Sequence, residues 1–188
     1  MVAMAYDSTA TKQRILEAAT TEFAEFGVAG ARIDRIAANA QANKRALYEY
    51  FGDKNALFAA VLERQLTDCA ESVPLDGADP ADYASRLMDY HAAHPEALRL
   101  LLWEALEFGD RPVPAEAARS DKYGKRTEAI ASGDTGLADP KLLQFFILGL
   151  VNWGAAAPQL RRMVLGEDYT HERLRDAVAD AVRALSKG

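Results

Sequence analysis

The sequence predicts an all-α protein made of a small helical head and a larger helical body. Apolar residues recur at three- and four-residue spacing along nearly the whole chain, and no alternating apolar–polar run is long enough for a confident strand. The first marked shift in composition is a segment rich in Pro, Gly and Asp over residues 74–80, which is typical of a linker. We therefore expect one domain over 9–69, a boundary near residue 75 and a second domain over 75–188.

Composition narrows the class of protein. The chain has 188 residues, of which 49% are hydrophobic and 27% charged, as in ordinary soluble globular proteins. The net charge of -6 argues against a nonspecific nucleic-acid coat and against a polybasic membrane binder. The single Cys69 excludes an intramolecular disulfide framework. Neither a signal peptide nor a stretch long enough to cross a bilayer is visible, so we expect a cytoplasmic protein without a membrane partner.

Four helices are expected in the head, in the order long, short, short, long. The first is predicted to end at Gly27, and its apolar face contains Ile15, Leu16, Ala19, Phe23 and Phe26. The next two are predicted at Ile33–Ala40 and at Lys44–Phe51, with Asn43 capping the latter. The fourth helix is expected from Asp53 to about Ser72 and joins the head to the body. In the body, helices are predicted near 80–93, 95–108, 114–131, 140–157 and 171–186.

The two short helices, separated by a turn of three or four residues, form a helix-turn-helix candidate. Helical hairpins are common and most of them bind nothing. The second helix of this pair, however, is too short to bury much surface, and its outward residues are hydrogen-bond donors suited to phosphate oxygens and base edges. These donors are Lys44, Arg45, Tyr48 and Tyr50, followed by Lys54 at the start of the next helix. The small Ala46 lets the backbone approach the floor of a groove.

The stretch from Asn43 to Phe58 reads NKRALYEYFGDKNALF, and it resembles the signature of the TetR-type (TetR/AcrR) family of bacterial transcriptional regulators. That signature is a Leu-Tyr-x-(Tyr/His)-Phe core followed by a loop, a Lys and a Leu-Phe or Leu-Leu pair. Upstream elements agree in type and spacing: Arg14-Ile15-Leu16-x-Ala18-Ala19, Phe23, Phe26-Gly27 and Ile36-Ala37. The resemblance covers about a third of the chain, roughly residues 9–69, and several spaced elements coincide.

The resemblance implies that the head binds double-stranded operator DNA through a motif at about 32–51. The family positions that face bases hold Lys44, Arg45 and Ala46. The positions that contact phosphates hold Tyr48, Tyr50 and Lys54. Core positions that hold the recognition helix in place contain Leu47 and Phe51. For Tyr48 an alternative remains open, namely an aromatic ring that fills the core between helices.

Three residues depart from the family pattern. Gln41 stands where the family usually has Gly, so either Gln41 adopts a left-handed conformation or the turn is reshaped. Arg32 replaces the usual Thr cap of the second helix, which predicts weaker capping but gives Arg32 reach toward a phosphate. Glu49 is unusual on a recognition helix. It either accepts a hydrogen bond from a cytosine amino group or repels phosphate and limits nonspecific binding.

For the body, the resemblance implies a small-molecule cavity and a homodimer that pairs the last two helices of each subunit in a four-helix bundle. Aromatic and polar candidates for the cavity are Tyr90, His94, Trp103, Phe108, Tyr123, Phe146 and Trp153. The helix at 140–157 is apolar nearly all round, so we expect it to be buried on more than one side. Candidates for the dimer contact are Leu150, Gly154, Leu174, Val178, Ala181 and Leu185, with a monomer core as the alternative.

Other chemistry is not indicated. His91 and His94 lie three residues apart without a third ligand at a diagnostic spacing, so we expect no metal site. Cys69 is interpreted as a small buried hydrophobic residue, with a redox role as the alternative. The loop 133–136 lacks the lysine of a phosphate cradle, and no nucleophile elbow or zinc-protease motif is present. We therefore expect neither an enzyme nor a cofactor.

Together these observations predict a homodimeric regulator, most simply a repressor, that a small-molecule effector of unknown identity releases from a palindromic operator. The alternative is a helical ligand-binding or interaction protein that no longer reads DNA, and Glu49 and the altered turn favour it. The net charge does not exclude DNA binding. Residues 1–65 contain eight basic and eight acidic side chains, so the whole net charge of -6 lies in the rest of the chain. A neutral head predicts weak binding to random sequence.

Overall fold

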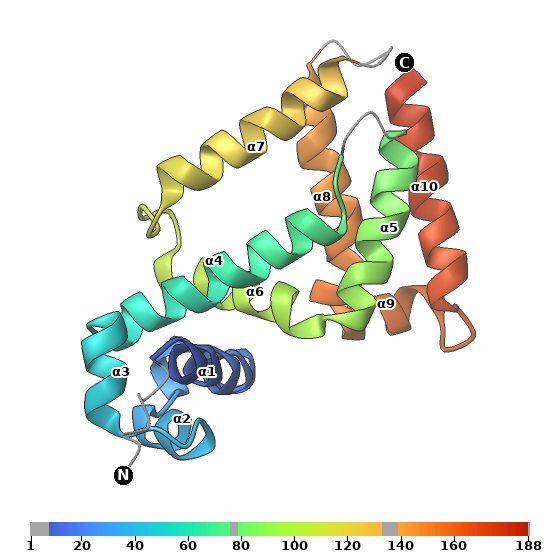
Figure 1. The fold of residues 1–188 in the computed structure, drawn as a ribbon. Coiled ribbons are helices and arrows are strands. Elements are labelled where there is room, and N and C mark those ends of the chain that lie inside the picture. Colours follow the sequence, from blue (N-terminus) through green and yellow to red (C-terminus); the bar gives the residue numbers. More distant parts are fainter. Residues whose placement is uncertain (1–7, 76–78, 133–138, 188) are drawn as a thin grey trace. The chain divides into compact units, whose positions relative to one another are not determined.

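The computed structural model describes residues 8–75, 79–132 and 139–187, and among these residues it contains ten helices and no strand (Figure 1). The all-α prediction is therefore confirmed. The helices are α1 (Ser8–Gly30), α2 (Ile33–Asn39), α3 (Lys44–Phe51), α4 (Lys54–Ser72), α5 (Pro80–Ala93), α6 (Pro95–Phe108), α7 (Glu116–Ala131), α8 (Pro140–Ala156), α9 (Pro158–Leu165) and α10 (His171–Lys187). Within the described ranges, none of the helices combines the length and the apolar character that crossing a bilayer requires.

By packing, the chain divides into two compact units. The head unit contains Met1–Thr67 together with Arg99–Pro114, and the body unit contains Asp68–Leu98 together with Ala115–Gly188. Most of α6 packs with the head unit although it follows α5 in the chain. Both α4 and α6 contribute residues to each unit.

The core of the head unit gathers one face from each of its helices. Phe23 of α1 and Phe58 of α4 meet edge to face, with their ring centroids 5.3 Å apart. Ile36 of α2, Leu47 of α3 and Leu100 of α6 are buried around them. The predicted core position Leu47 is therefore confirmed, and the recognition helix is anchored through it.

The chain bends at Gly27, where the first helix was predicted to end. Although α1 extends to Gly30, Gly27 has a φ of 67° and a ψ of -177°, which is not helical. The Cβ of any other residue would lie 2.7 Å from the Trp103 ring. The Nε1–H of Trp103 donates to the carbonyl oxygen of Ala24 (3.2 Å), as does Nε–H of Arg99 (2.8 Å). These contacts fasten α6 to α1 inside the head unit.

The body unit is built on α5, α8 and α10, which lie side by side (Figure 1). Its core includes Leu87, Leu143, Ile147 and Val182. Cys69 is buried in the same core, where desolvation raises the pKa of its thiol.

The apolar helix α8 is buried on one face only. Leu143, Ile147 and Val151 face the core, whereas Phe145 is 70% exposed and Trp153 is 62% exposed. The expectation that this helix is buried on more than one side is thus not met within a single chain. The sequence does not predict α9, which begins with Pro158 at its first turn, ends at Leu165 and is followed by Gly166, whose φ is 82°.

Candidate nucleic-acid interface

The turn between α2 and α3 is a left-handed helix end formed without glycine. Gln41 has a φ of 50°, so the first of the two conformations considered for it is the one observed. The N–H of Gln41 donates to the Ala38 carbonyl oxygen (3.1 Å), and the N–H of Ala42 donates to that of Ala37 (3.0 Å). This pair of bonds satisfies the last carbonyls of α2. Because Gln41 has a Cβ atom, its left-handed conformation strains the backbone at this turn.

The start of α3 is capped as the sequence predicts. Oδ1 of Asn43 accepts the N–H of Ala46 at 2.7 Å. The turn is also tied to α1, because Nε of Arg14 donates to the carbonyl oxygen of Ala40 at 3.1 Å. The position of the recognition helix is therefore determined by a cap at its own start and by a hydrogen bond from α1 to the preceding turn.

The start of α2 is capped from another helix, which corrects the prediction of weaker capping. Arg32 makes no side-chain cap. Instead, the carboxylate of Glu22 on α1, only 4% exposed, accepts the N–H of Arg32 at 2.7 Å. The same carboxylate accepts Nε–H of Arg35 (2.9 and 3.0 Å to its two oxygens) and Nη2–H of Arg35 (2.6 Å). Burial alone raises the pKa of Glu22, but these hydrogen bonds outweigh it and the net pKa is lowered.

The position of Glu22 in the sequence carries a signal of its burial. Residue 22 lies seven positions after Ile15 and three after Ala19, so it occupies the apolar stripe of α1. A charged residue at such a position is rarely buried unless it is paired. The required cation, Arg35, comes from a different helix, and for that reason the partner was not evident from the sequence.

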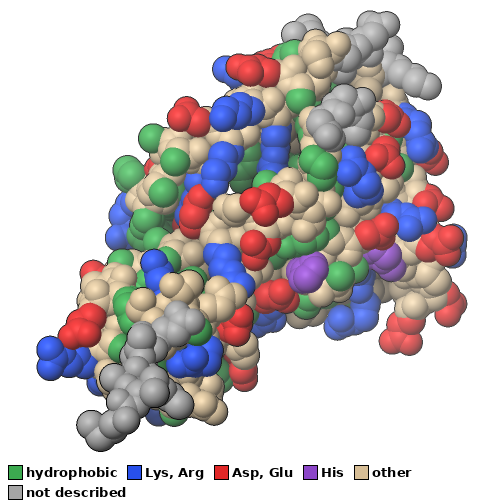
Figure 2. All heavy atoms as spheres, in the orientation of Figure 1, with side chains coloured by type: hydrophobic (Ala, Val, Ile, Leu, Met, Phe, Trp, Pro, Cys, Tyr) green, Lys and Arg blue, Asp and Glu red, His purple; other side chains and the backbone are tan. Residues whose placement is uncertain are grey.

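The exposed face of α3 carries two paired cations. Nζ of Lys44 lies 3.0 Å from Oδ1 of Asp34, and Nε of Arg45 lies 2.6 Å from Oε1 of Glu49. Tyr48 is 45% exposed, so it does not fill the core between helices. Basic and acidic side chains are also interspersed over the face of the molecule seen in Figure 2. Any DNA contact of this helix therefore involves cations that are already paired with carboxylates.

The remaining predicted DNA contacts differ in their surroundings. Ala46, which was expected to face bases, is only 7% exposed. Tyr50 is half-buried, and its ring meets that of Phe51 edge to face at 6.3 Å. Arg32 is exposed. Nζ of Lys54 donates to the carbonyl oxygens of Ala31 (3.4 Å) and Ala29 (3.5 Å), near the end of α1.

Comparison with known proteins identifies the family. Residues 15–61 match the family model of bacterial regulatory proteins of the tetR family. Residues 79–184 match the model of the tetracyclin repressor-like C-terminal domain. The chain is also 46% identical over 188 residues to the HTH-type transcriptional repressor SCO4008 of Streptomyces coelicolor, covering 96% of this chain and 97% of that protein. The chain belongs to the tetR family of bacterial regulatory proteins. This tetR-family protein is a DNA-binding transcriptional regulator.

Solved structures agree with this assignment. A putative transcriptional regulator from Streptomyces coelicolor, SCO4942, superimposes with a TM-score of 0.77 at 37% identity and covers 93% of this chain and 97% of its own. AibR, solved in complex with isovaleryl coenzyme A and operator DNA, shares the fold with a TM-score of 0.66 at 22% identity, covering 91% of this chain and 97% of its own. Isovaleryl coenzyme A and operator DNA are the ligands of AibR, and this likeness shows only that the two proteins share a fold.

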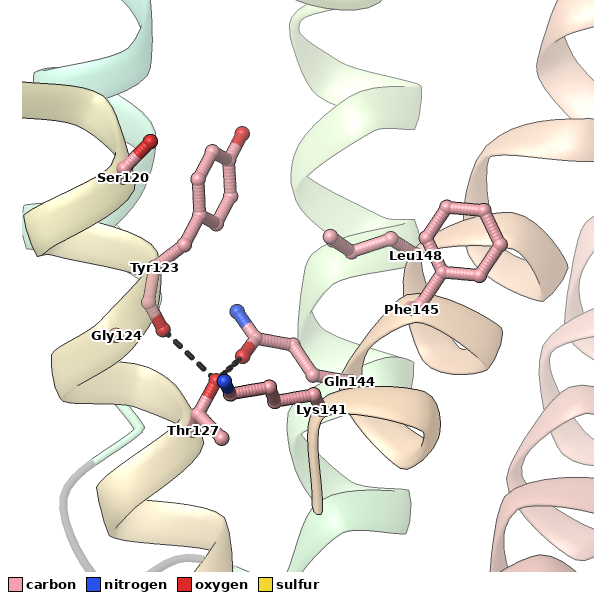
Figure 3. A pocket seen from close by; sticks show the side chains of 8 residues that line it. All are labelled: Ser120, Tyr123, Gly124, Thr127, Lys141, Gln144, Phe145 and Leu148. Atoms are coloured by element: carbon pink, nitrogen blue, oxygen red, sulfur yellow. Dashed lines mark hydrogen bonds between the residues drawn. The ribbon is translucent and has the colours of Figure 1, made fainter. Parts of the chain in front are cut away.

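The body unit of the tetR-family protein contains an open cavity of about 480 Å³ between α7 and α8 (Figure 3). It is lined by Ser120, Tyr123, Gly124, Thr127, Lys141, Gln144, Phe145 and Leu148. In Figure 3 the Gln144 side chain reaches across to Thr127, whose hydroxyl contacts Oε1 of Gln144 and donates to the Tyr123 carbonyl oxygen (3.1 Å). Tyr123 is the predicted ligand residue that lies here.

The other predicted cavity residues are distributed elsewhere. Trp103 and Phe108 belong to the head unit, and Phe146 and Trp153 lie on the exposed face of α8. Tyr90 and His94 pack against each other with their ring centroids 4.5 Å apart, and burial raises the pKa of Tyr90 to about 12. The structure therefore does not gather the seven predicted side chains around one cavity of the body unit.

His91, beside this pair, is a buried titratable group. It is 8% exposed, and its Nδ1 has no hydrogen-bond partner among the described residues. Burial, with a smaller contribution from His94, lowers its pKa to about 4. In the part of the chain that the structure describes, no three His, Cys, Asp or Glu side chains are grouped as metal ligands would be.

The outer face of α8 is apolar and exposed in the single chain. A hollow of about 340 Å³ on it is lined by Phe145, Phe146, Gly149, Leu150 and Leu185. Two predicted dimer residues lie in this hollow, Leu150 and Leu185. Gly154 instead approaches Leu174 of the same chain, since a Cβ at residue 154 would lie 2.9 Å from its Cδ2. Val178 is 6% exposed within its own core and Ala181 is half-buried, so Val178 differs from the dimer expectation.

Proposed function

We propose that this protein is a homodimeric repressor that binds a palindromic operator and leaves it when a small molecule binds the body unit. The observation that carries the proposal is the exposed face of α3, which presents Lys44, Arg45 and Tyr48 from a capped and anchored helix. The likeness to a protein named as a transcriptional repressor, over nearly the full length of both chains, supports repression rather than activation. We also infer that it acts in the cytoplasm and without catalysis.

In the proposed complex, α3 lies in the major groove. Lys44 and Arg45 contact base edges, because they stand at the exposed N-terminal end of the helix. Tyr48 and Tyr50 contact phosphates through their hydroxyl groups. Arg32 and Lys54 supply charge at the edges of the motif, and Lys54 releases its weak carbonyl contacts to reach a phosphate. Ala46 has no part in this arrangement because it is buried.

Footprinting on the DNA that flanks its own gene tests the DNA-binding part of the proposal. We expect protection of a palindrome at moderate salt, and we expect Lys44→Ala to weaken binding to it without changing the fold. A reporter placed behind the same DNA distinguishes repression from activation. If the wild-type protein protects no palindrome, the alternative of a helical interaction protein is favoured instead. The ion pairs of Lys44 and Arg45 would then explain why α3 does not bind DNA.

A second copy of the chain is the proposed partner of the exposed face of α8. Reading a two-fold operator requires two heads related by symmetry, and an isologous contact buries the same apolar patch of both subunits. The exposed apolar residues Phe145, Phe146, Leu150 and Trp153 form that patch. We expect sedimentation equilibrium to show a dimer for the wild type and a monomer for Phe145→Glu. Leu106→Glu, at a site 76% exposed in the head unit, is the matched control and stays dimeric.

The cavity between α7 and α8 is the proposed effector site. Its polar end offers the ammonium of Lys141 with the polar atoms of Thr127 and Gln144, whereas Phe145 and Leu148 supply apolar wall. The site therefore suits a molecule with an apolar body and a hydrogen-bond acceptor at one end. A screen for compounds that raise thermal stability tests this assignment, because ligands stabilise the native state they bind. Leu148→Trp, which fills the cavity, should abolish both the stabilisation and the release from DNA.

A further inference from the structure

Arg45 and Glu49 form an ion pair on the part of the protein that reads DNA. They lie one helical turn apart on α3, with Nε of Arg45 2.6 Å from Oε1 of Glu49. Their side chains are 86% and 59% exposed. A pair this exposed contributes little to the stability of a helix, so folding does not explain a carboxylate at this position. Next to phosphates, that carboxylate weakens binding unless it has a compensating role.

The atoms used by the pair suggest that role. Glu49 accepts from Nε of Arg45, and among the described residues no other hydrogen bond to this guanidinium is present. The two terminal Nη groups therefore remain available as a planar fork. Such a fork matches O6 and N7 of guanine, which is the commonest specific contact in the major groove. With Nε held by Glu49, the plane and direction of the fork are set before DNA arrives.

The neighbouring pair lacks this property. Lys44 contacts Asp34 at 3.0 Å, but an ammonium is a compact charge with rotating donors and has no plane to orient. The carboxylate of Glu49 also introduces discrimination. When Arg45 faces guanine, both charges stay paired. When Arg45 faces another base, its two Nη groups lack the two acceptors of guanine, while Glu49 still repels phosphate. Binding to such a sequence is therefore weaker.

We propose that Glu49 is a positioning residue that holds Arg45 for bidentate recognition of a guanine in each operator half-site. The inference rests on the proposed placement of α3 in the major groove. It assigns to Glu49 an indirect role through Arg45, which differs from accepting a bond from cytosine and from general repulsion of phosphate. It also predicts part of the operator, namely one G·C pair per half-site whose guanine cannot be replaced.

The test uses the full-length protein and a set of operators in which each base pair is changed in turn, with binding measured at one fixed salt concentration. For the wild type we expect one G·C pair whose replacement, or whose substitution by 7-deazaguanine, weakens binding by tenfold or more. Arg45→Ala removes that preference. Glu49→Ala lowers this preference but leaves part of it, and it strengthens binding to random DNA. The double variant shows no further loss at that position.

Two control variants make the outcome specific. Asp82→Ala breaks an equivalent pair on α5, where Nε of Arg86 lies 2.8 Å from Oδ2 of Asp82, and it should leave the base preference unchanged. Glu49→Gln keeps an acceptor for Nε without the charge, so it should retain more of the preference than Glu49→Ala does. Circular dichroism of each variant confirms that α3 is still folded.

Several results would overturn the inference. One is an intact guanine preference in Glu49→Ala, and another is an equal loss of affinity for every sequence. A third is an effect of Glu49→Ala on the preference that persists when Arg45 is already alanine, because Glu49 then acts on a base directly. If the wild type itself shows no base preference at any position, both this inference and the proposed function fail. The first three results overturn the positioning role alone.

Discussion

The indole ring of Trp103 occupies the space in which any side chain at residue 27 would begin. Its Cε3 atom lies 2.7 Å from the position of a Cβ built on Gly27, closer than real Cβ contacts come. Gly27 also has a φ of 67°, which side chains rarely adopt. Both facts concern the head unit, where α6 is fastened to α1 by Trp103 and Arg99. Because residue 27 has no side chain, the Trp103 ring can lie against α1 at this point.

Replacing Gly27 by alanine should destabilise the head. The expected loss in the free energy of unfolding is about 2–4 kcal/mol, from the left-handed conformation together with overpacking against the ring. Denaturant unfolding of the full chain, followed by tryptophan fluorescence, measures it. Gly124→Ala is the control, because residue 124 is helical and nothing lies within 4 Å of its Cβ position. Equal stability of the two variants would contradict the argument.

The Glu22 carboxylate should contribute measurably to stability. Glu22→Gln removes the charged acceptor of Arg35 and of the Arg32 N–H, and we expect a loss of about 2–3 kcal/mol in the free energy of unfolding. Since the pKa of Glu22 is lowered in the folded state, its ionic contribution is present above its ordinary pKa of 4.5 and is lost as the pH falls below that value. The variant should therefore lose less stability on acidification. Glu25→Gln, exposed on the same helix, is the control and should behave as the wild type.

Glycine at residue 41 should stabilise the turn before α3. Gln41 adopts a φ of 50°, and glycine reaches this region without a Cβ penalty. After the greater flexibility of glycine in the unfolded chain is subtracted, a gain of about 0.5–1 kcal/mol in the free energy of unfolding is expected for Gln41→Gly. The same change at Ala38, an exposed residue inside α2, should instead cost about 1 kcal/mol. A loss of stability in Gln41→Gly would show that the Gln41 side chain itself is needed.

His91 should make the stability of the body unit depend on pH in the mildly acidic range. Burial lowers its pKa to about 4 from an ordinary value of 6.5, so the unfolded chain binds the proton more readily. The free energy of unfolding is therefore highest above pH 6.5, and it decreases as the pH falls toward 4 because the unfolded chain gains a proton that the folded chain does not. At pH 5 about 2 kcal/mol should be lost relative to pH 7. Denaturant unfolding at both pH values checks this.

His91→Leu tests this prediction. The free energy of unfolding of this variant should differ much less between pH 7 and pH 5 than that of the wild type. His94→Gln is the control, since His94 lies half-exposed at the end of the same helix. If His91→Leu keeps the full pH dependence of the wild type, the buried imidazole is not its source.

Those features of the head that depend only on residues close together in the chain could mostly be predicted from the sequence. The cap at Asn43 and the bend at Gly27 follow from residue types with strong local preferences. The missed features depend on residues distant in the chain. Ala46 was expected at the bases but is buried, because its environment is set by how α3 rests on the other helices. The helix α9 has only eight residues and none of them is buried, so no core-facing residue indicated it.

The sequence by itself determined the helical class, the bounds of most helices, the helix-turn-helix and the family, because periodicity, caps and motif spacing are local properties. The tertiary structure alone decided that α6 packs with the head, that Glu22 caps α2, and that the cavity of the body unit lies between α7 and α8. It also decided that Nε of Arg45 is held by Glu49 while its fork stays available. Each of these depends on which side chains meet and through which atoms, and residue spacing carries no such information.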